Sequence, residues 1–128
     1  MTQIAISGRN ASIDAVNNFI NNGTVEIRTG QPAQVDAEPT GIVIAIITLG
    51  STAFNLAVDG VSIANSTLAT TALTTGTAGH YVVKDTTGKV QRNGTAGVTG
   101  SNMILNRTSI VENGEVKIAS WQFNQLGQ

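Results

Sequence analysis

The chain has 128 residues, no cysteine, and a formal net charge of −1 from 7 Lys and Arg against 8 Asp and Glu. These numbers exclude a disulfide scaffold and a thiolate zinc site, and they argue against nucleic-acid binding through neutralised phosphates. The 31 Ile, Leu and Val residues exclude a disordered chain, and the 17 Thr, 12 Asn and 14 Gly favour one all-β domain with many turns.

The N-terminal part is predicted to hold an extended arm and the chain's one helix. Residues 1–9 are expected to form the arm or a first strand, because residues 3–7 alternate polar and apolar side chains. A helix is expected over 10–22, since Ile13, Val16 and Ile20 follow helical spacing. Asn10 or Ser12 can cap its start, and Gly23 offers a stop.

Neither a secretory signal nor a membrane-spanning segment is visible in the sequence. The longest apolar run, residues 42–49, is far shorter than the roughly 20 residues of a spanning helix. We therefore expect a soluble protein made in the cytoplasm of its host, without a membrane partner.

Short strands and turns follow the helix. Strands are expected at 24–29, with Val25 and Ile27 facing inward, and at 42–49, separated by a loop over 31–41 that holds both prolines. Asp59-Gly60 lies between the apolar runs 53–58 and 61–64 and predicts a hairpin. Residues 65–79 are low in complexity and are expected to hold one weak strand and a loop.

The second half continues the pattern. Strands are expected at 80–85, 89–92, 103–106, 109–112 and 115–123. The Gly-rich stretch 94–102 is interpreted as a loop, and the tetrapeptide GTAG, at 76–79 and 94–97, as turn composition.

The last strand changes phase within its length. Val116 and Ile118 share one parity and Trp121 and Phe123 the other, which predicts either a bulge near 119–120 or a strand end that is covered on both faces. The whole pattern favours a jelly-roll or Greek-key β-sandwich of about eight short strands with one N-terminal helix, forming a single domain over residues 10–128.

Catalytic motifs are not found. The single histidine, His80, has no second His or Cys to share a site with and is expected at a surface or a hairpin end. GVSIA, at residues 60–64, lacks the final glycine of a nucleophile elbow. We therefore predict no enzyme, no catalytic residues, no cofactor and no metal.

Four segments carry a resemblance to a known family: GTVEIRTGQPAQVDAEPTG, IVIAIITLG, GTAGHYVVKDTTGKV and LNRTSIVENGEVKIASWQF. Over Gly23 to Phe123 the chain resembles small proteins encoded among the head genes of tailed bacteriophages, which act as capsid decoration or cement proteins. The resemblance implies a jelly-roll or related sandwich that binds the outer head surface at two-fold or three-fold positions. Its partners would be the major capsid protein and further copies of itself, in a dimer or trimer on the virion.

Composition agrees with such a role, because Thr, Asn and Ser enter interfaces at a lower desolvation cost than Lys or Glu. The hypothesis assigns shell contacts to the arm, the 31–41 loop and the C-terminal segment. Its residues are Gln3, Ile4, Ile6, Arg9, Pro32, Pro39, Trp121, Phe123 and Leu126. Trp121 and Phe123 are equally compatible with a place in the core.

Two alternatives stay open. One is a ligand- or carbohydrate-binding β-sandwich module of a phage tail or a cell-surface protein, for which few exposed aromatic residues are available. The other is a small enzyme with a sparse site around His80.

Overall fold

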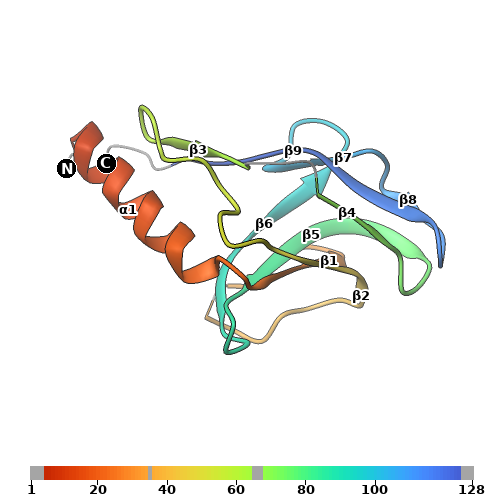
Figure 1. Ribbon diagram of the computed structural model, residues 1–128. Coiled ribbons are helices and arrows are strands. Elements are labelled where there is room, and N and C mark those ends of the chain that lie inside the picture. Colours follow the sequence, from red (N-terminus) through yellow and green to blue (C-terminus); the bar gives the residue numbers. More distant parts are fainter. Residues whose placement is uncertain (1–4, 35, 65–67, 125–128) are drawn as a thin grey trace.

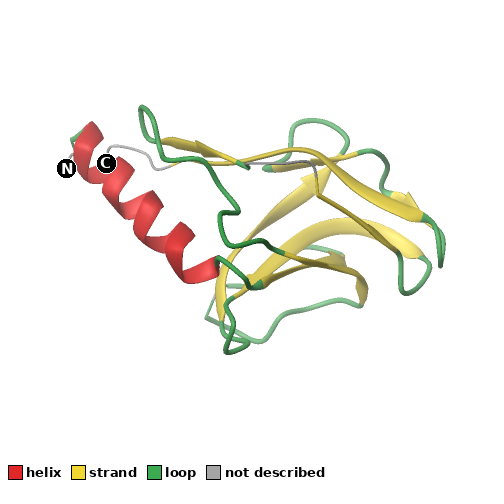
Figure 2. Cartoon of the chain, in the orientation of Figure 1, coloured by secondary structure: helices red, strands yellow, loops and turns green. Residues whose placement is uncertain are grey.

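The computed structural model describes residues 5–34, 36–64 and 68–124, and the side chains up to Gln122. This part of the chain forms one helix and nine strands (Figures 1 and 2). The elements are α1 (Ile6–Ile20), β1 (Thr24–Thr29), β2 (Val43–Thr48), β3 (Val61–Ile63), β4 (Leu68–Thr71), β5 (Gly76–Lys84), β6 (Val90–Gly97), β7 (Met103–Leu105), β8 (Ser109–Ile110) and β9 (Glu115–Asn124).

The strands form one curled, mixed sheet in the order β2-β1-β5-β6-β7-β9-β3, with β4 also paired to β9 and β8 to β5. All of these pairs are antiparallel except β6–β7. The sheet curls so that the segment just after β4 lies beside β2, where the Leu73 N–H donates to the Ile44 carbonyl at 2.7 Å. The predicted class, mainly β with a single helix, is confirmed.

The core lies between the two halves of the curled sheet. Trp121 of β9 is 1% exposed, and its ring meets Phe54 edge-on at 4.8 Å and Tyr81 of β5 at 5.2 Å between centroids. Around these rings pack the branched side chains that alternate inward along β1, β2 and β9. Burial raises the pKa of Tyr81, opposed by a hydrogen bond with Trp121 and by the Arg92 charge.

The helix begins earlier than predicted. It spans Ile6–Ile20 in place of 10–22, so residues 6–9 form its first turns and are not an extended arm. Neither Asn10 nor Ser12 caps it: the N-cap is Ala5, without a side-chain hydrogen bond.

The C-terminal end of the helix leads directly into the sheet. Asn22 takes the left-handed conformation, with φ of 65°, and the chain then enters β1. A Cβ at Gly23 would collide with the Lys84 carbonyl. This glycine is therefore needed for close approach to β5.

Two local predictions are confirmed. Asp59 and Gly60 have φ of 54° and 77°, and Val58 and Val61 exchange backbone hydrogen bonds of 2.8 and 3.0 Å, which defines a two-residue hairpin turn. In β9 the pairing to β7 shifts so that Ala119 is skipped, which is the bulge that the change of parity predicted.

Other expectations are wrong. Residues 53–58 form isolated bridges and not a regular strand. Both GTAG segments lie inside strands, β5 and β6, and not in turns.

Candidate functional site

One end of the molecule, which we call the helix end, consists of α1 and residues 53–63 (Figure 1). Within residues 53–60, the N–H groups of Asn55 and Val58 donate to backbone carbonyls of residues 63 and 61, while three others donate to side chains of α1 and its C-cap. The three contacts are Ala53 N to Asn21 Oδ1 at 3.1 Å, Ala57 N to Asp14 Oδ1 at 2.8 Å and Gly60 N to Asn10 Oδ1 at 2.8 Å. Helical spacing places the three acceptors on one side of α1, where they replace a missing strand partner.

A buried polar cluster joins the helix end to the sheet. The Asn17 amide, 6% exposed, donates to Ser62 Oγ at 2.9 Å and accepts from Arg92 Nη1 of β6 at 2.9 Å. The Ser62 hydroxyl in turn donates a hydrogen bond to the Asn55 carbonyl at 2.7 Å. Burial lowers the pKa of Arg92 to about 10, so its side chain remains charged at neutral pH and Asn17 supplies an acceptor for that charge.

Exposed apolar side chains gather at the helix end. α1 and residues 53–63 make up about a fifth of the chain, yet they hold five of the ten exposed large apolar side chains among the described residues. The five are Ile6, Phe19, Leu56, Val58 and Ile63, which are 45–79% exposed. Contiguous exposed apolar patches mark contact surfaces, and these five side chains are the candidates for such a surface at the helix end.

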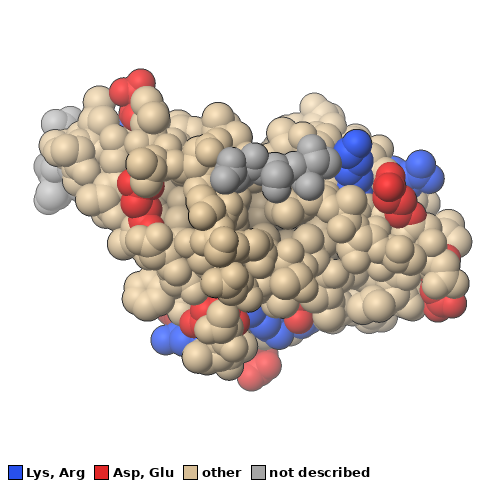
Figure 3. Space-filling view, viewed as in Figure 1, with Lys and Arg blue, Asp and Glu red and all other residues tan. Residues whose placement is uncertain are grey.

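Charged groups are few on this protein, with 7 Lys and Arg and 8 Asp and Glu. On the face in Figure 3, Lys, Arg, Asp and Glu lie near the margins and leave the central area uncharged. On the outer face of the sheet, Glu26 is buried and paired with Arg28 at 2.7 Å and Lys84 at 3.0 Å. Arg92, a basic residue of the β5–β6 hairpin, points to Asn17.

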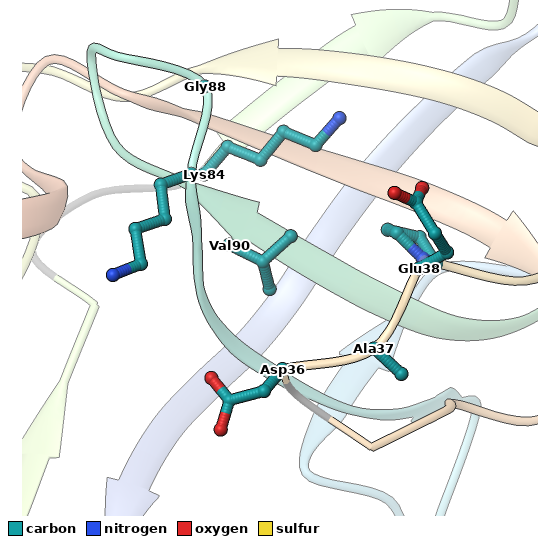
Figure 4. Close-up of a pocket in the computed structure, with 8 residues that line it drawn as sticks. Asp36, Ala37, Glu38, Lys84, Gly88 and Val90 are labelled. Carbon is teal, nitrogen blue, oxygen red and sulfur yellow. The ribbon is translucent and has the colours of Figure 1, made fainter.

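The 31–41 loop folds over the outer face of the sheet, and Asn93 of β6 donates to its Ala33 carbonyl at 2.7 Å. Between this loop and the β5–β6 hairpin lies an open cleft of about 290 Å³ (Figure 4). Its charged lining is Asp36, Glu38, Lys84 and Lys89. Two acids and two bases balance, so the cleft favours neither an anion nor a cation.

A second cleft, of about 450 Å³, separates α1 from residues 51–56. Its lining is rich in amides and hydroxyls and includes one carboxylate. The residues are Asp14, Asn17, Asn18, Asn21, Ser51, Thr52, Phe54, Asn55 and Leu56. Groups of this kind bind neutral polar ligands by hydrogen bonds.

His80 is buried, and the expectation that it lies at a surface is wrong. Its side chain is 0% exposed because the loop that begins at Gly30 covers it, and Nδ1 lies 2.9 Å from the Gly30 carbonyl. Nε2 has no hydrogen-bond partner in the described structure. Among the described residues no group of three or more His, Cys, Asp or Glu side chains could hold a metal ion.

The predicted contact residues do not form one surface. Gln3, Ile4 and Leu126 lie outside the described residues, and for Phe123 only the backbone is described, paired with Ser62. Trp121 is a core residue and offers no surface to a partner, so its assignment to a contact is wrong. Ile6 is exposed and Arg9 half-buried on α1, while Pro32 and Pro39 are half-buried in the distant loop.

Leu56 and Val58 were missed by the sequence pattern. The run AFNLAV places Phe54, Leu56 and Val58 on one face of an expected strand, which assigns all three to the core. Because residues 53–58 are irregular, only Phe54 turns inward, while Leu56 is 79% and Val58 67% exposed.

No family model, curated protein or solved structure matches this chain. Among the described residues, no helix has the length and apolar character required to cross a membrane.

Proposed function

We propose that the protein is a structural virion subunit, a capsid decoration or cement protein, that binds the outer head surface of a tailed phage through its helix end. The observation that carries this proposal is the concentration of five exposed apolar side chains at that end, on a molecule with few charges. A surface of this composition loses little hydration energy when it is covered.

The rigid attachment of the helix end supports the same role. The side chains of Asn10, Asp14 and Asn21 hold residues 53–60 against α1, so Leu56 and Val58 are presented on an ordered scaffold. Pre-organised contacts lower the entropy cost of binding. With many copies on one shell, modest individual contacts become cumulative where neighbouring shell proteins are engaged together.

The finer fold assignment, a jelly-roll or Greek-key sandwich, belongs to the same proposal. It is supported by mainly antiparallel strands that enclose one core. Its partners would be the major capsid protein and further copies of this chain.

Two valine variants test the surface. Val58→Lys should weaken binding to purified shells at least tenfold, because an ammonium group would be buried at the contact. Val111→Lys is the matched control: Val111 is 65% exposed against 67% for Val58, but lies between β8 and β9, away from the helix end. Sedimentation of labelled protein with shells measures both.

Equal binding by the two variants would contradict the assignment to the helix end. Quantitative mass spectrometry of purified virions tests the role itself, and we expect copy numbers comparable with those of the shell protein. Absence of the polypeptide, or only a few copies per particle, would overturn the decoration role.

A ligand-binding module is the second candidate, and the amide-lined cleft beside α1 is the observation that favours it. Titration calorimetry with a panel of neutral mono- and disaccharides tests it. Under this alternative, heat of binding would be lost in Asn18→Ala, because Asn18 is an exposed residue that lines the cleft. No binding of any sugar at millimolar concentration would dismiss it.

A further inference from the structure

His80 lies on the outer face of the sheet beneath residues 30–34, which we call the strap. The strap is bonded first to β5 and then to β6. The Gly30 carbonyl lies 2.9 Å from His80 Nδ1, and the Ala33 carbonyl accepts from Asn93 Nδ2 at 2.7 Å. His80 is 0% exposed. Two side chains therefore fasten the strap to the sheet, and one of them is an imidazole that can take up a proton.

The imidazole of His80 fits beneath the strap in its neutral form. A carbonyl oxygen only accepts hydrogen bonds, so Nδ1 carries the proton of the bond to Gly30 and Nε2 keeps a lone pair. Nε2 is buried and has no hydrogen-bond partner within the described part of the chain. A proton added at Nε2 would bury an N–H donor and a positive charge without an acceptor, which is costly. The closed strap is therefore compatible with the neutral ring and not with the charged one.

The charged groups that β1 and β5 direct to this face do not compensate a charge on His80. Its partner in the β1–β5 ladder is Arg28, and residues opposite each other in a ladder lie on the same face. Glu26, the next residue of β1 on this face, is already engaged by Arg28 at 2.7 Å and by Lys84 of β5 at 3.0 Å. The one buried carboxylate on this face is thus shared by two cations.

β6 and the strap add no charge beside His80. Its partner in the β5–β6 ladder is the uncharged Thr95, and the strap has the sequence GQPAQ. Asp36 and Glu38, further along the same loop, are exposed and line the open cleft together with two lysines (Figure 4). An imidazolium ring beneath the strap would therefore meet the like charge of Arg28 first.

We propose that protonation of His80 releases the strap, so that the outer face of β5 is covered at neutral pH and becomes accessible in mild acid. An exposed histidine gains its charge as the pH falls through about 6.5, whereas the closed form keeps the ring neutral. The closed form is therefore favoured above that pH and disfavoured below it. Because opening takes up one proton, its equilibrium constant should rise about tenfold from about pH 7.5 to about pH 5.5.

The sequence makes this proposal testable, because His80 is the single histidine of the chain. Other side chains normally keep their charge between about pH 7.5 and 5.5. A change in access to the outer face over this range therefore reports on His80. The proposal concerns the free protein and does not depend on capsid binding.

Two neighbouring valines of β5 distinguish release of the strap from opening of the sheet. Val82 is 2% exposed and lies on the same face as His80, whereas Val83 is 0% exposed and belongs to the core. The chain has no cysteine, so thiol labelling of Val82→Cys measures access beneath the strap and labelling of Val83→Cys measures opening of the core. Thr99→Cys, at an exposed loop position, gives the rate for an accessible thiol at each pH. Circular dichroism checks that the three variants are folded.

Relative to Thr99→Cys, labelling of Val82→Cys should rise about tenfold from about pH 7.5 to about pH 5.5, while Val83→Cys stays slow. Adding His80→Asn should abolish the rise, because the asparagine Nδ2 can still donate to the Gly30 carbonyl but takes up no proton. NMR of the imidazole is a second measurement that leaves residue 80 unchanged. Its protonation and the rise in labelling of Val82→Cys should have the same midpoint.

The proposal would be overturned by relative labelling of Val82→Cys that does not change with pH, by a rise that persists with His80→Asn, or by different midpoints in the two measurements. An equal rise at Val83→Cys would also overturn it, because that result would show unfolding of the sheet and not release of the strap. Since all of these measurements use the free protein, their failure leaves the shell-binding test unaffected.

Discussion

The two ends of this molecule are held together by different forces. Where the halves of the curled sheet face each other, Trp121, Tyr81 and Phe54 pack ring against ring in an apolar interior. At the helix end, asparagine and aspartate side chains bond the backbone of an irregular segment, with Asn17 and Arg92 buried below. The difference follows from the backbone: a strand has its N–H groups paired by its neighbours, whereas residues 53–60 need other acceptors.

The comparison also explains the asparagine-rich composition. The Asn10 and Asn17 amides of α1 each accept a hydrogen bond from outside the helix, so the helix is attached by directional bonds, and Phe19 is exposed. We therefore expect the sheet interior to carry most of the free energy of unfolding and the helix end to determine local order.

Trp121→Ala should have the largest effect. The substitution removes both ring contacts and leaves a cavity between the two halves of the sheet, which should lower the free energy of unfolding by about 3–5 kcal/mol. Urea denaturation measures it, with Val98→Ala at an exposed position as a control expected within about 0.5 kcal/mol of the natural chain. A loss below about 1 kcal/mol would mean that the rings are not the centre of the core.

Asn17→Ala should come next, at about 1–3 kcal/mol, because it leaves the buried Arg92 charge without one of its acceptors and Ser62 without a donor. Asn18→Ala, one residue further along the same helix and exposed, is the control and should change the free energy of unfolding by less than about 0.5 kcal/mol. Equal effects would show that the cluster contributes nothing beyond helix propensity.

Asn10→Ala should cost about 1 kcal/mol, since it leaves the Gly60 N–H without its acceptor in a partly buried place. Hydrogen exchange should report faster exchange of that amide while the amides of β5 keep their protection. Ser12→Ala is the control, because the Ser12 hydroxyl bonds only the Gly8 carbonyl within the helix. Loss of protection throughout the sheet would contradict a local role for this bond.

The sequence allowed local features to be predicted where a single pattern governs them. The parity change between Ile118 and Trp121 is explained by a bulge or by a strand end covered on both faces, and the structure has the bulge; Asp-Gly between apolar runs has one favoured turn. Both were confirmed. The jelly-roll or sandwich assignment and the capsid role stay predictions.

Features that depend on distant contacts could not be predicted. His80 is buried because the 31–41 loop folds back over β5, and the GTAG segments lie in strands. At Gly79 a Cβ would collide with the Gly30 carbonyl, a distant contact invisible in the sequence. The start of the helix was missed because Ala5 caps it without a side-chain bond, while Asn10 and Ser12 resemble caps. The Asn10 side chain instead accepts a hydrogen bond from the backbone N–H of Gly60, fifty positions along the chain.

Asp85→Asn should have the smallest effect. Its side chain bonds backbone N–H groups as those of the helix end do, but at a solvent-exposed hairpin tip. At the tip of the β5–β6 hairpin, Asp85 Oδ1 accepts from the Thr87 hydroxyl at 2.6 Å and from the Thr87 and Lys89 N–H groups at 2.9 and 3.1 Å. Hydrogen bonds from the side chains of Thr87 and Gln91, followed by those backbone bonds, hold the pKa of Asp85 well below its ordinary value of 3.8.

A carboxyl whose pKa is lowered by folding stabilises the protein above its ordinary pKa, and this contribution is lost as the pH falls through the folded pKa. The melting temperature of the natural chain should therefore exceed that of Asp85→Asn at about pH 7, with the difference shrinking below about pH 4. Asp36→Asn, an exposed aspartate in the 31–41 loop, is the control and should show no comparable trend. A difference that stays constant across this range would mean that the Asp85 bonds act without the charge, as the amide bonds of the helix end do.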